Sequence, residues 1–174
     1  MACTITTTGR ALQCKDALGG IREVYIRQYA GTGGFAQPSS GAISDAAEAL
    51  TFPQFEMQAG SSSFTQTVNA STENGSVHYS QVLSLSFNKM RQADVAEIAD
   101  LNRARLSVIV RDKNDNYWVM GHANGCEVTG GTFVSGQAVG DLNGCTVEIT
   151  AMETIAAPFL TTTSGGNITF AAAS

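Results

Sequence analysis

Apolar and polar residues alternate most regularly over Ser76–Phe87, "SVHYSQVLSLSF". Strict alternation is typical of a β-strand with one buried face and one wetter face. At twelve residues the stretch is about twice the usual length of a strand. The apolar face would carry Val77, Tyr79, Leu83, Leu85 and Phe87.

Shorter alternating runs predict several further strands, and the first of them places Val24 and Ile26 on one face and Tyr25 on the other. Pro53 favours an edge strand or an irregular start for its segment. The predicted strands are Gly20–Tyr29, Leu50–Gln58, Ser62–Ala70, Arg103–Asp112, Asn116–Ala123, Cys145–Glu153 and Gly166–Ala173.

Turn residues indicate how these strands are joined. The run "AGSS" (59–62) predicts a hairpin between its two flanking strands, and "KNDN" (113–116) predicts another. Asn74-Gly75 is the strongest hairpin signal. Asn143-Gly144, with Asp141 as a side-chain cap, is interpreted as a hairpin turn in which both residues accept a positive φ, rather than as a reactive loop.

A single strong helical pattern covers Arg91–Arg103, with Val95, Ile98 and Leu101 on one stripe. The small, polar stretch Ala30–Ala49 predicts a long loop, with a helical turn capped by Ser44. We therefore expect one domain over residues 1–174: an antiparallel β-sandwich or barrel, one flanking helix, and a projecting loop and hairpin region over about 30–76.

Charge is scarce: only 14% of the residues are Asp, Glu, Lys or Arg, against about 25% in an average domain. Interface cores are depleted in charge, so this composition favours a chain covered by copies of itself. The formal net charge is −5 and no basic cluster is present. Tight binding of nucleic acid is therefore not expected, although an acidic wall would let DNA pass without adhering.

The first residues lack the basic start and apolar run of a signal peptide, and no stretch is long and apolar enough for a membrane span. We expect the chain to stay in the cytoplasm in which it is made. In that compartment Cys3, Cys14, Cys126 and Cys145 are expected to be free and buried; the alternative is oxidation of the pairs Cys3/Cys14 and Cys126/Cys145 across adjacent strands.

Three short runs partly match known catalytic or ligand-binding motifs, but each lacks residues that its motif requires. "GTGGFA" (31–36) is not followed by a helix, and "DKNDNYW" has Tyr117 where a calcium loop needs glycine. His122 and Cys126, even with Cys145, make a weak metal site. We therefore predict no catalytic residues, no cofactor and no metal.

The helix at Arg91–Arg103 and the runs "VIVRDKNDNYWVMG" and "TGGTFVSGQAVGDLNGCTVEITAMETIAAPF" together resemble tail tube proteins of tailed bacteriophages. "CKDALGGIREVYIRQY" near the N-terminus is similar in character. The resemblance implies hexameric rings that stack into a hollow tube for DNA ejection, with strands of neighbouring copies joined into one barrel. It also implies a virion protein, made in the host bacterial cytoplasm, whose partners are itself, other tail proteins and passing DNA, with no membrane.

In such a tube, the long, poorly charged segment Ala30–Gln58 and the "ASTENG" turn (70–75) would contribute to the stacking contacts between rings. The wetter face of Ser76–Phe87 would line the lumen. The residues that we expect at contacts between copies are Thr32, Phe35, Pro38, Phe52, Phe55, Asn74 and Tyr79.

Other structural roles in a phage particle fit the same features: a head–tail connector, a tail terminator or a capsid decoration protein. A carbohydrate-binding or adhesion sandwich is a more distant alternative, because aromatic residues are only 7% and Trp118 is the sole tryptophan.

Overall fold

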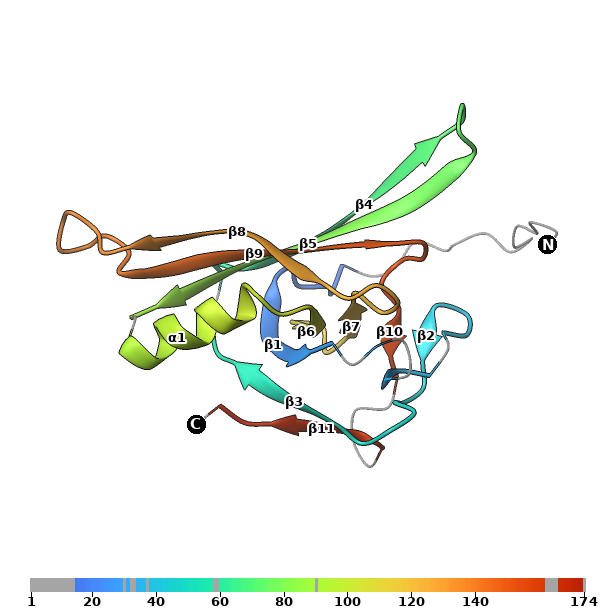
Figure 1. Ribbon diagram of the computed structural model, residues 1–174, viewed down its shortest axis with the longest axis horizontal. Helices are drawn as coiled ribbons and strands as arrows, with labels where there is room; N and C mark the ends of the chain where they lie inside the picture. Colours follow the sequence, from blue (N-terminus) through green and yellow to red (C-terminus); the bar gives the residue numbers. More distant parts are fainter. Residues whose placement is uncertain are drawn as a thin grey trace.

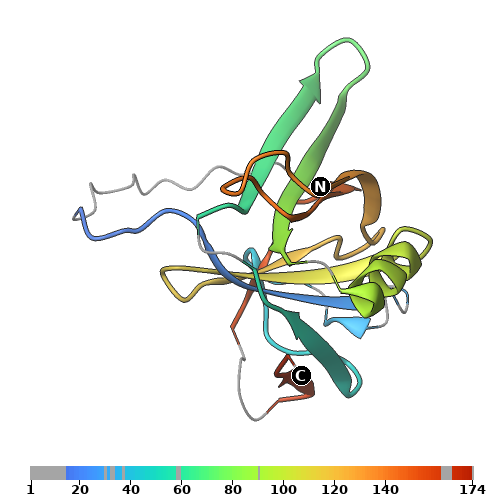
Figure 2. The same cartoon turned by 90° about the vertical axis from the view of Figure 1, so that its left-hand side faces the viewer.

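The structure is a computed structural model that describes residues 15–29, 31, 34–36, 38–57, 60–89, 91–161 and 166–173. Two sheets pack face to face, in the orders β11-β3-β1-β6-β7-β10-β2 and β4-β5-β9-β8, with a helix beside them (Figures 1 and 2). The elements are β1 (Ile21–Gln28), β2 (Ala42–Ile43), β3 (Leu50–Phe55), β4 (Ser63–Ser71), β5 (Ser76–Asn88), α1 (Gln92–Leu101), β6 (Leu106–Asp112), β7 (Tyr117–Met120), β8 (Glu127–Val134), β9 (Gly144–Glu153), β10 (Phe159–Leu160) and β11 (Ile168–Ala171). The predicted β-sandwich with a flanking helix is confirmed, and the sheets are open rather than closed into a barrel.

The first hydrophobic core fills the space between the two sheets. Strands β1, β6 and β7 supply one side, and β5 and β9 supply the other. The predicted faces of β1 are confirmed, because Val24 and Ile26 enter this core whereas Tyr25 points to the opposite side. Core residues from the four-stranded sheet are Leu83, Leu85, Val147, Ile149 and Ala151.

A second core lies on the other side of the seven-stranded sheet, which curls around it. Ile109 and Val119 come from the middle of that sheet, Phe52 and Ile168 from one end, and Leu160 from the other. The pairs β3–β11 and β2–β10 are parallel, whereas the remaining pairs are antiparallel, as expected. The curl buries both faces of the central strands, which explains the almost unbroken burial of β6.

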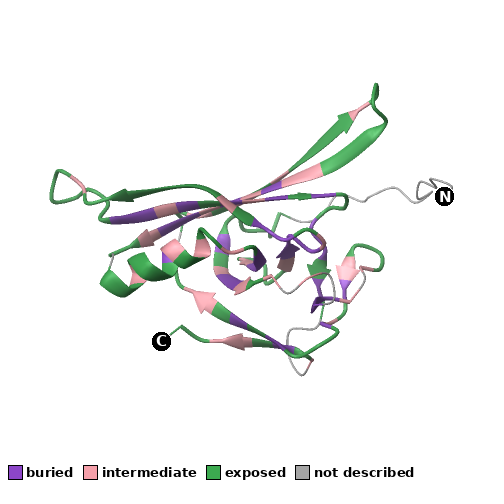
Figure 3. Ribbon diagram, viewed as in Figure 1, coloured by how far each residue is buried: buried purple, intermediate pink, exposed green. Residues whose placement is uncertain are grey.

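The strands β4 and β5 form a long hairpin that extends well beyond the body of the protein (Figure 2). The strand predicted from alternation is confirmed and is one residue longer than expected, at thirteen residues. Its apolar face is buried only where the body lies beneath it, at Leu83 and Leu85; towards the tip, Val77 is exposed (Figure 3). The turn containing Asn74-Gly75 closes this hairpin, as predicted.

Helix α1 lies against the end of the sandwich and confirms the predicted helix. Ile98 is buried in the first core and Leu101 packs against it. The prediction for Val95 is wrong, since this side chain is 46% exposed. Only the C-terminal half of the apolar stripe packs on the core, and the first turn of the helix lies beyond it.

Three local predictions are wrong, in full or in part. The run 59–62 does not join a hairpin, because β3 pairs with β1 and β11 in one sheet while β4 pairs with β5 in the other. Strand β3 is accordingly not an edge strand. Pro53 itself is paired on one side only, with Ala171 of β11, because β1 pairs with Gln54 and Phe55. Ser44 caps no helical turn, because the chain there leaves the short strand β2 and forms a bridge between Phe35 and Ala46.

The hairpin predicted at Asn143-Gly144 exists, but its geometry differs from the prediction. Strands β8 and β9 pair, with residues 135–143 as the connecting loop, and Gly144 already belongs to β9. Asp141 caps the loop as predicted, accepting hydrogen bonds from the backbone N–H groups of Gln137 and Ala138 at 2.9 and 2.7 Å. Gly144 is required by a close approach instead of a positive φ: a Cβ there would lie 1.9 Å from the carbonyl oxygen of Phe87.

Candidate assembly surface

The outer face of the four-stranded sheet consists mainly of hydroxyl side chains. The register places alternate residues of all four strands on this face, and the opposite residues enter the core where the body lies beneath the sheet. We call this surface the hydroxyl face; its members are Ser63, Thr65, Thr67, Asn69 and Ser71 of β4, Ser76, His78, Ser80, Val82, Ser84 and Ser86 of β5, Thr146, Glu148, Thr150 and Met152 of β9, and Glu127, Thr129, Thr132 and Val134 of β8.

Hydrogen bonds between hydroxyl groups tie β8 to β9 across this face. The Oγ1 atoms of Thr129 and Thr150 are 2.9 Å apart, and those of Thr132 and Thr146 are 2.7 Å apart. Such cross-strand pairs fix the side-chain orientations and stabilise the register of the two strands. The face is therefore polar but ordered.

The four-stranded sheet carries no Lys or Arg on any strand, and its charged residues are Glu127, Glu148 and the buried Glu153. The sequence already contains this signal, since no Lys or Arg occurs between Arg27 and Lys89 or after Lys113. The cations of the described residues lie elsewhere, as in the network that joins Arg111 to Glu23 at 2.8 Å. The hydroxyl face is thus neutral to acidic along its whole length.

Both borders of the four-stranded sheet are free within the described residues, because β4 pairs only with β5 and β8 only with β9. Each neighbouring pair is antiparallel, so the two border strands run in opposite directions. Unpaired strand borders present rows of N–H and C=O groups that can pair with another chain. A second copy of the sheet, added side by side, would continue the antiparallel order.

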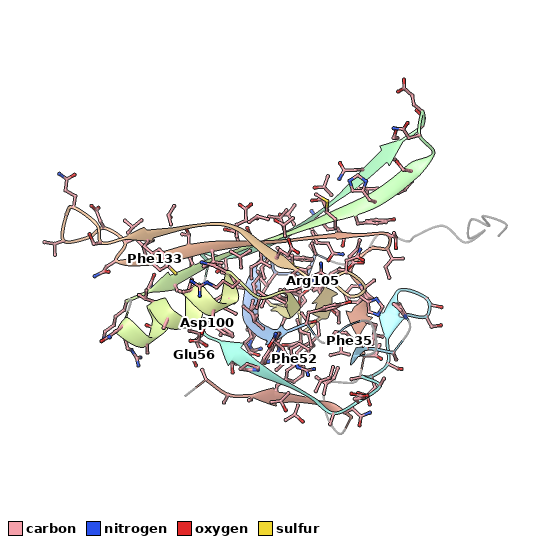
Figure 4. The ribbon with its side chains drawn as sticks, viewed as in Figure 1. Phe35, Phe52, Glu56, Asp100, Arg105 and Phe133 are labelled. Atoms are coloured by element: carbon pink, nitrogen blue, oxygen red, sulfur yellow. The ribbon has the colours of Figure 1, made fainter. Side chains whose placement is uncertain are left out.

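Apolar residues are exposed at both ends of the same sheet. Val68 and Val77, near the tip of the β4–β5 hairpin, are 57% and 53% exposed. At the opposite end Phe133 is 55% exposed (Figure 4) and Val134 is 42% exposed. The register puts Val68, Val77 and Phe133 on the core-side face, where the sheet overhangs the body.

The residues predicted at contacts between copies differ in where they lie: some are buried in a core and others are on the surface. Phe35 and Phe52 are buried in the second core, with ring centroids 5.9 Å apart, so the prediction that they form contacts between copies is corrected. The segment around them covers the curled sheet and is part of the domain, which its weak periodicity concealed. Phe55 is half-buried against Phe87 of the first core.

The remaining predicted residues include surface positions. Asn74 is exposed in the hairpin turn, Tyr79 is half-buried on the core-side face of the hairpin, and Pro38 is half-buried in the loop before β2. Thr32 lies outside the described residues. The structure thus brings Asn74 and Tyr79 together on the projecting hairpin and leaves Pro38 apart from them.

A buried polar group links the β7–β8 connection to the four-stranded sheet. The Glu153 carboxyl accepts hydrogen bonds from the backbone N–H groups of Ala123 and Asn124 at 3.0 and 2.8 Å, and Gln81 accepts one from Gly121 at 3.1 Å. The imidazole of His122 is buried and has no hydrogen-bond partner among the described residues, and its ring centroid is 6.1 Å from that of Phe35. These residues hold a connection in place between the two cores, which the sequence patterns did not reveal.

Chemistry at the cysteines is disfavoured. Cys126 and Cys145 are free and buried, as predicted for this pair, whereas Cys3 and Cys14 lie outside the described residues. Burial raises the pKa of the Cys126 thiol far above its ordinary value, and the nearby Glu153 raises it further. Burial also raises the pKa of Cys145. Thiolates are the reactive form, so neither group is activated as a nucleophile.

No cluster of three or more His, Cys, Asp or Glu side chains suited to a metal ion is present among the described residues. A surface hollow of about 400 Å³ lies between the end of β3 and α1. Phe55, Lys89, Asp94 and Glu97 are among the residues that line it, and Ser, Thr, Cys and His are not. Its lining therefore combines apolar side chains with both acidic and basic ones.

No family model, curated protein or solved structure matches this chain. Within the described part of the chain, no helix has the length and apolar character needed to cross a membrane.

Proposed function

We propose that this protein is a structural subunit of a bacteriophage particle that assembles into stacked rings, forming a tail tube through which DNA is ejected. The observation that carries the proposal is the hydroxyl face: a polar surface without Lys or Arg, on a sheet whose two borders are unpaired within the part of the chain that the structure describes. The protein would act by shape and self-association, with no catalytic step and no cofactor.

Ring formation follows from the strand directions. Border strand β8 of one copy would pair with β4 of the next, and because these strands run in opposite directions the antiparallel alternation continues across the junction. Such a contact is head-to-tail, and head-to-tail contacts give closed rings when the rotation closes. Closure would satisfy both borders of the four-stranded sheet, which is how barrels remove edges.

Stacking of rings would use the two overhanging ends of the sheet. The β4–β5 hairpin projects from one end, and Phe133 and Val134 lie at the other. In a stack of rings that all point the same way, the hairpin of one copy meets the opposite end of a copy in the next ring. The contact would cover Val68 and Val77 together with Phe133, which are otherwise exposed to water.

The hydroxyl face suits the wall of a channel for DNA. Proteins bind DNA mainly through Lys and Arg contacts to phosphates, and this sheet offers none. Glu127 and Glu148 add negative charge that repels phosphates. DNA would therefore pass along the wall without being retained.

A pair of proline substitutions in β4 tests the role of the free border. Successive N–H groups of an edge strand alternate between the paired strand and the free side. Of Thr67→Pro and Val68→Pro, one removes a hydrogen bond to β5 and the other removes only a donor on the free border. We expect the border variant to unfold at nearly the wild-type denaturant concentration and yet to stay monomeric in sedimentation velocity, whereas the wild type assembles. Assembly of both folded variants at the wild-type concentration would argue against pairing through β4.

Negative-stain imaging of the wild-type assembly separates the tail tube from the other structural roles. Long tubes support the proposal. Single rings that do not stack would indicate a connector or terminator, and small discrete oligomers a decoration protein. A monomer that binds immobilised glycans would indicate the adhesion alternative.

A further inference from the structure

We propose that Asn74, in the turn of the projecting hairpin, is a site of spontaneous deamidation and that the other two Asn-Gly pairs of the described chain are protected by the fold. Those pairs are Asn124-Gly125 and Asn143-Gly144. All three have the same local sequence chemistry, because glycine offers no side chain that hinders attack by its own nitrogen. The structure separates them by what surrounds each pair.

The reaction needs a free side chain and a mobile backbone. The Gly75 nitrogen loses its proton and attacks the Asn74 side-chain carbonyl carbon; a C–N bond forms, and the side-chain amide leaves as ammonia. Water then opens the resulting succinimide at either carbonyl and yields aspartate or isoaspartate. No oxidant or further reactant is consumed, and water and hydroxide suffice.

The surroundings of Asn74 meet both needs. The residue is exposed in the four-residue turn 72–75, beyond the last paired residues Ser71 and Ser76. No heavy atom lies within 4 Å of the position that a Cβ on Gly75 would take, so the glycine is surrounded by open space. The only contact recorded for Asn74 in the described structure is a 3.3 Å hydrogen bond from its backbone N–H to Ser71 Oγ. Its side-chain amide is therefore free to approach the Gly75 nitrogen.

At Asn124, hydrogen bonds hold both reacting groups, the side-chain amide and the nitrogen of the following glycine. Its side-chain amide donates to the carbonyl oxygen of Met152 at 2.9 Å, and the attacking nitrogen, that of Gly125, donates to the carbonyl oxygen of Gly121 at 3.1 Å. A Cβ on Gly125 would lie 2.7 Å from the Arg105 side chain, so the backbone there has no room to rotate.

Asn143 is restrained by the sheet. Gly144 is buried and paired on both sides, with Asn88 of β5 and Val134 of β8. The carbonyl oxygen of Asn143 accepts a 2.7 Å hydrogen bond from the Lys89 N–H. The Phe87 carbonyl group also packs closely against Gly144. Reaction at Asn124 or Asn143 therefore first requires local opening of the fold.

Conversion changes the hairpin turn. A carboxylate at position 74 would stand next to Glu73, and isoaspartate would lengthen the backbone of the turn by one carbon. The hairpin turn is thus where an unassembled subunit is deamidated first, and the reaction adds negative charge at the tip of the projecting hairpin.

Peptide mapping by mass spectrometry tests the inference on the full-length protein, kept monomeric by dilution. The protein is incubated at mildly alkaline pH and 37 °C, and the fraction converted is followed for all three peptides, with isoaspartate verified by methyltransferase labelling. We expect Asn74 to convert at least about tenfold faster than Asn124 and Asn143, because an opening free energy of only about 1.4 kcal/mol slows a reaction tenfold.

Two controls test whether the fold and the Asn74-Gly75 sequence account for the difference in rate. In urea all three peptides should convert at similar rates, which attributes the difference to the fold. In folded protein the variant Gly75→Ala should slow conversion at Asn74 severalfold while leaving the other two peptides unchanged. Equal rates at the three sites in folded protein, or faster conversion at Asn124 or Asn143, would overturn the inference.

Discussion

At the scale of single residues, Glu153 is a buried polar side chain that ties the β7–β8 connection to the four-stranded sheet. It is 1% exposed, and its carboxyl group accepts the backbone N–H groups of Ala123 and Asn124. Glu153→Ala would remove the shared acceptor of both part-buried N–H groups and empty the space of a buried side chain, which costs about 2–4 kcal/mol in the free energy of unfolding. Glu153→Gln keeps one acceptor oxygen and should cost clearly less. Urea denaturation followed by tryptophan fluorescence measures both; equal losses would mean that these hydrogen bonds are not what Glu153 contributes.

The carboxylates beside the β6–β7 turn give the protein a defined response to acid. Burial alone raises the pKa of Asp112, but hydrogen bonds from Asn116 and Asn114 outweigh it and hold this pKa below its ordinary 3.8. Burial likewise opposes a lowered pKa at Glu23, and the hydrogen bonds from Tyr25 and Arg111 outweigh it there.

A lowered folded-state pKa means that these two groups stabilise the fold above their ordinary pKa values and that the contribution is lost as pH falls through the folded values. The free energy of unfolding should therefore decline from about pH 4.5 downwards. The variant Asp112→Asn should show a shallower decline over this window than the wild type. An unchanged pH profile in that variant would contradict the assignment to Asp112.

At the scale of elements, the contact between β5 and β9 leaves no space for a side chain at Gly144. A Cβ there would overlap the Phe87 carbonyl oxygen at 1.9 Å, so Gly144→Ala should separate the strands and cost about 3 kcal/mol or more. Gly130 provides the matched control, because an added Cβ in β8 meets nothing within 4 Å. Gly130→Ala should change the free energy of unfolding by no more than about 0.5 kcal/mol. Equal denaturation midpoints for the two variants would show that β5 and β9 can accommodate a side chain at position 144.

The strands that alternation predicts are those whose two faces meet different surroundings. The strand β9 is the clearest case: Val147 and Ile149 are buried while Glu148 faces outward. What alternation does not reveal is the partner of each strand, and so β3 and β4, adjacent in sequence, were predicted to pair although they belong to different sheets. Their side chains fit either arrangement, and the choice depends on contacts far away in the chain, such as those of β3 with β1 and β11.

The candidate surface was predictable in composition but not in extent. Alternation placed the serines of β5 on the wetter face, and the gaps in Lys and Arg are legible in the sequence. The burial of Phe35 and Phe52 could not be predicted from the sequence, because their segment is rich in small residues and has no periodicity. Only the curling of the seven-stranded sheet creates the core that covers them.

At the scale of the whole molecule, the proposed channel depends on the absence of cations from the hydroxyl face. The double variant Thr65→Lys/Thr67→Lys places two exposed cations on that face. We expect tubes that still form but retain double-stranded DNA at low salt and release it as salt rises, since phosphate contacts are weakened by counterions. The variant Thr65→Gln/Thr67→Gln is the matched neutral control and should behave as the wild type in a DNA co-sedimentation assay. Failure of the lysine variant to bind DNA in intact tubes would place this face away from the channel.

The central claim is that copies of the chain join through the borders of the four-stranded sheet and enclose a channel lined by the hydroxyl face. Cryo-electron microscopy of the assembled wild-type protein tests this most directly. The account predicts β8 of each copy hydrogen-bonded to β4 of its neighbour, with Thr65, Thr132 and Glu148 facing the lumen. Monomers that persist at high concentration, or an assembly in which these side chains face the outside, would contradict it.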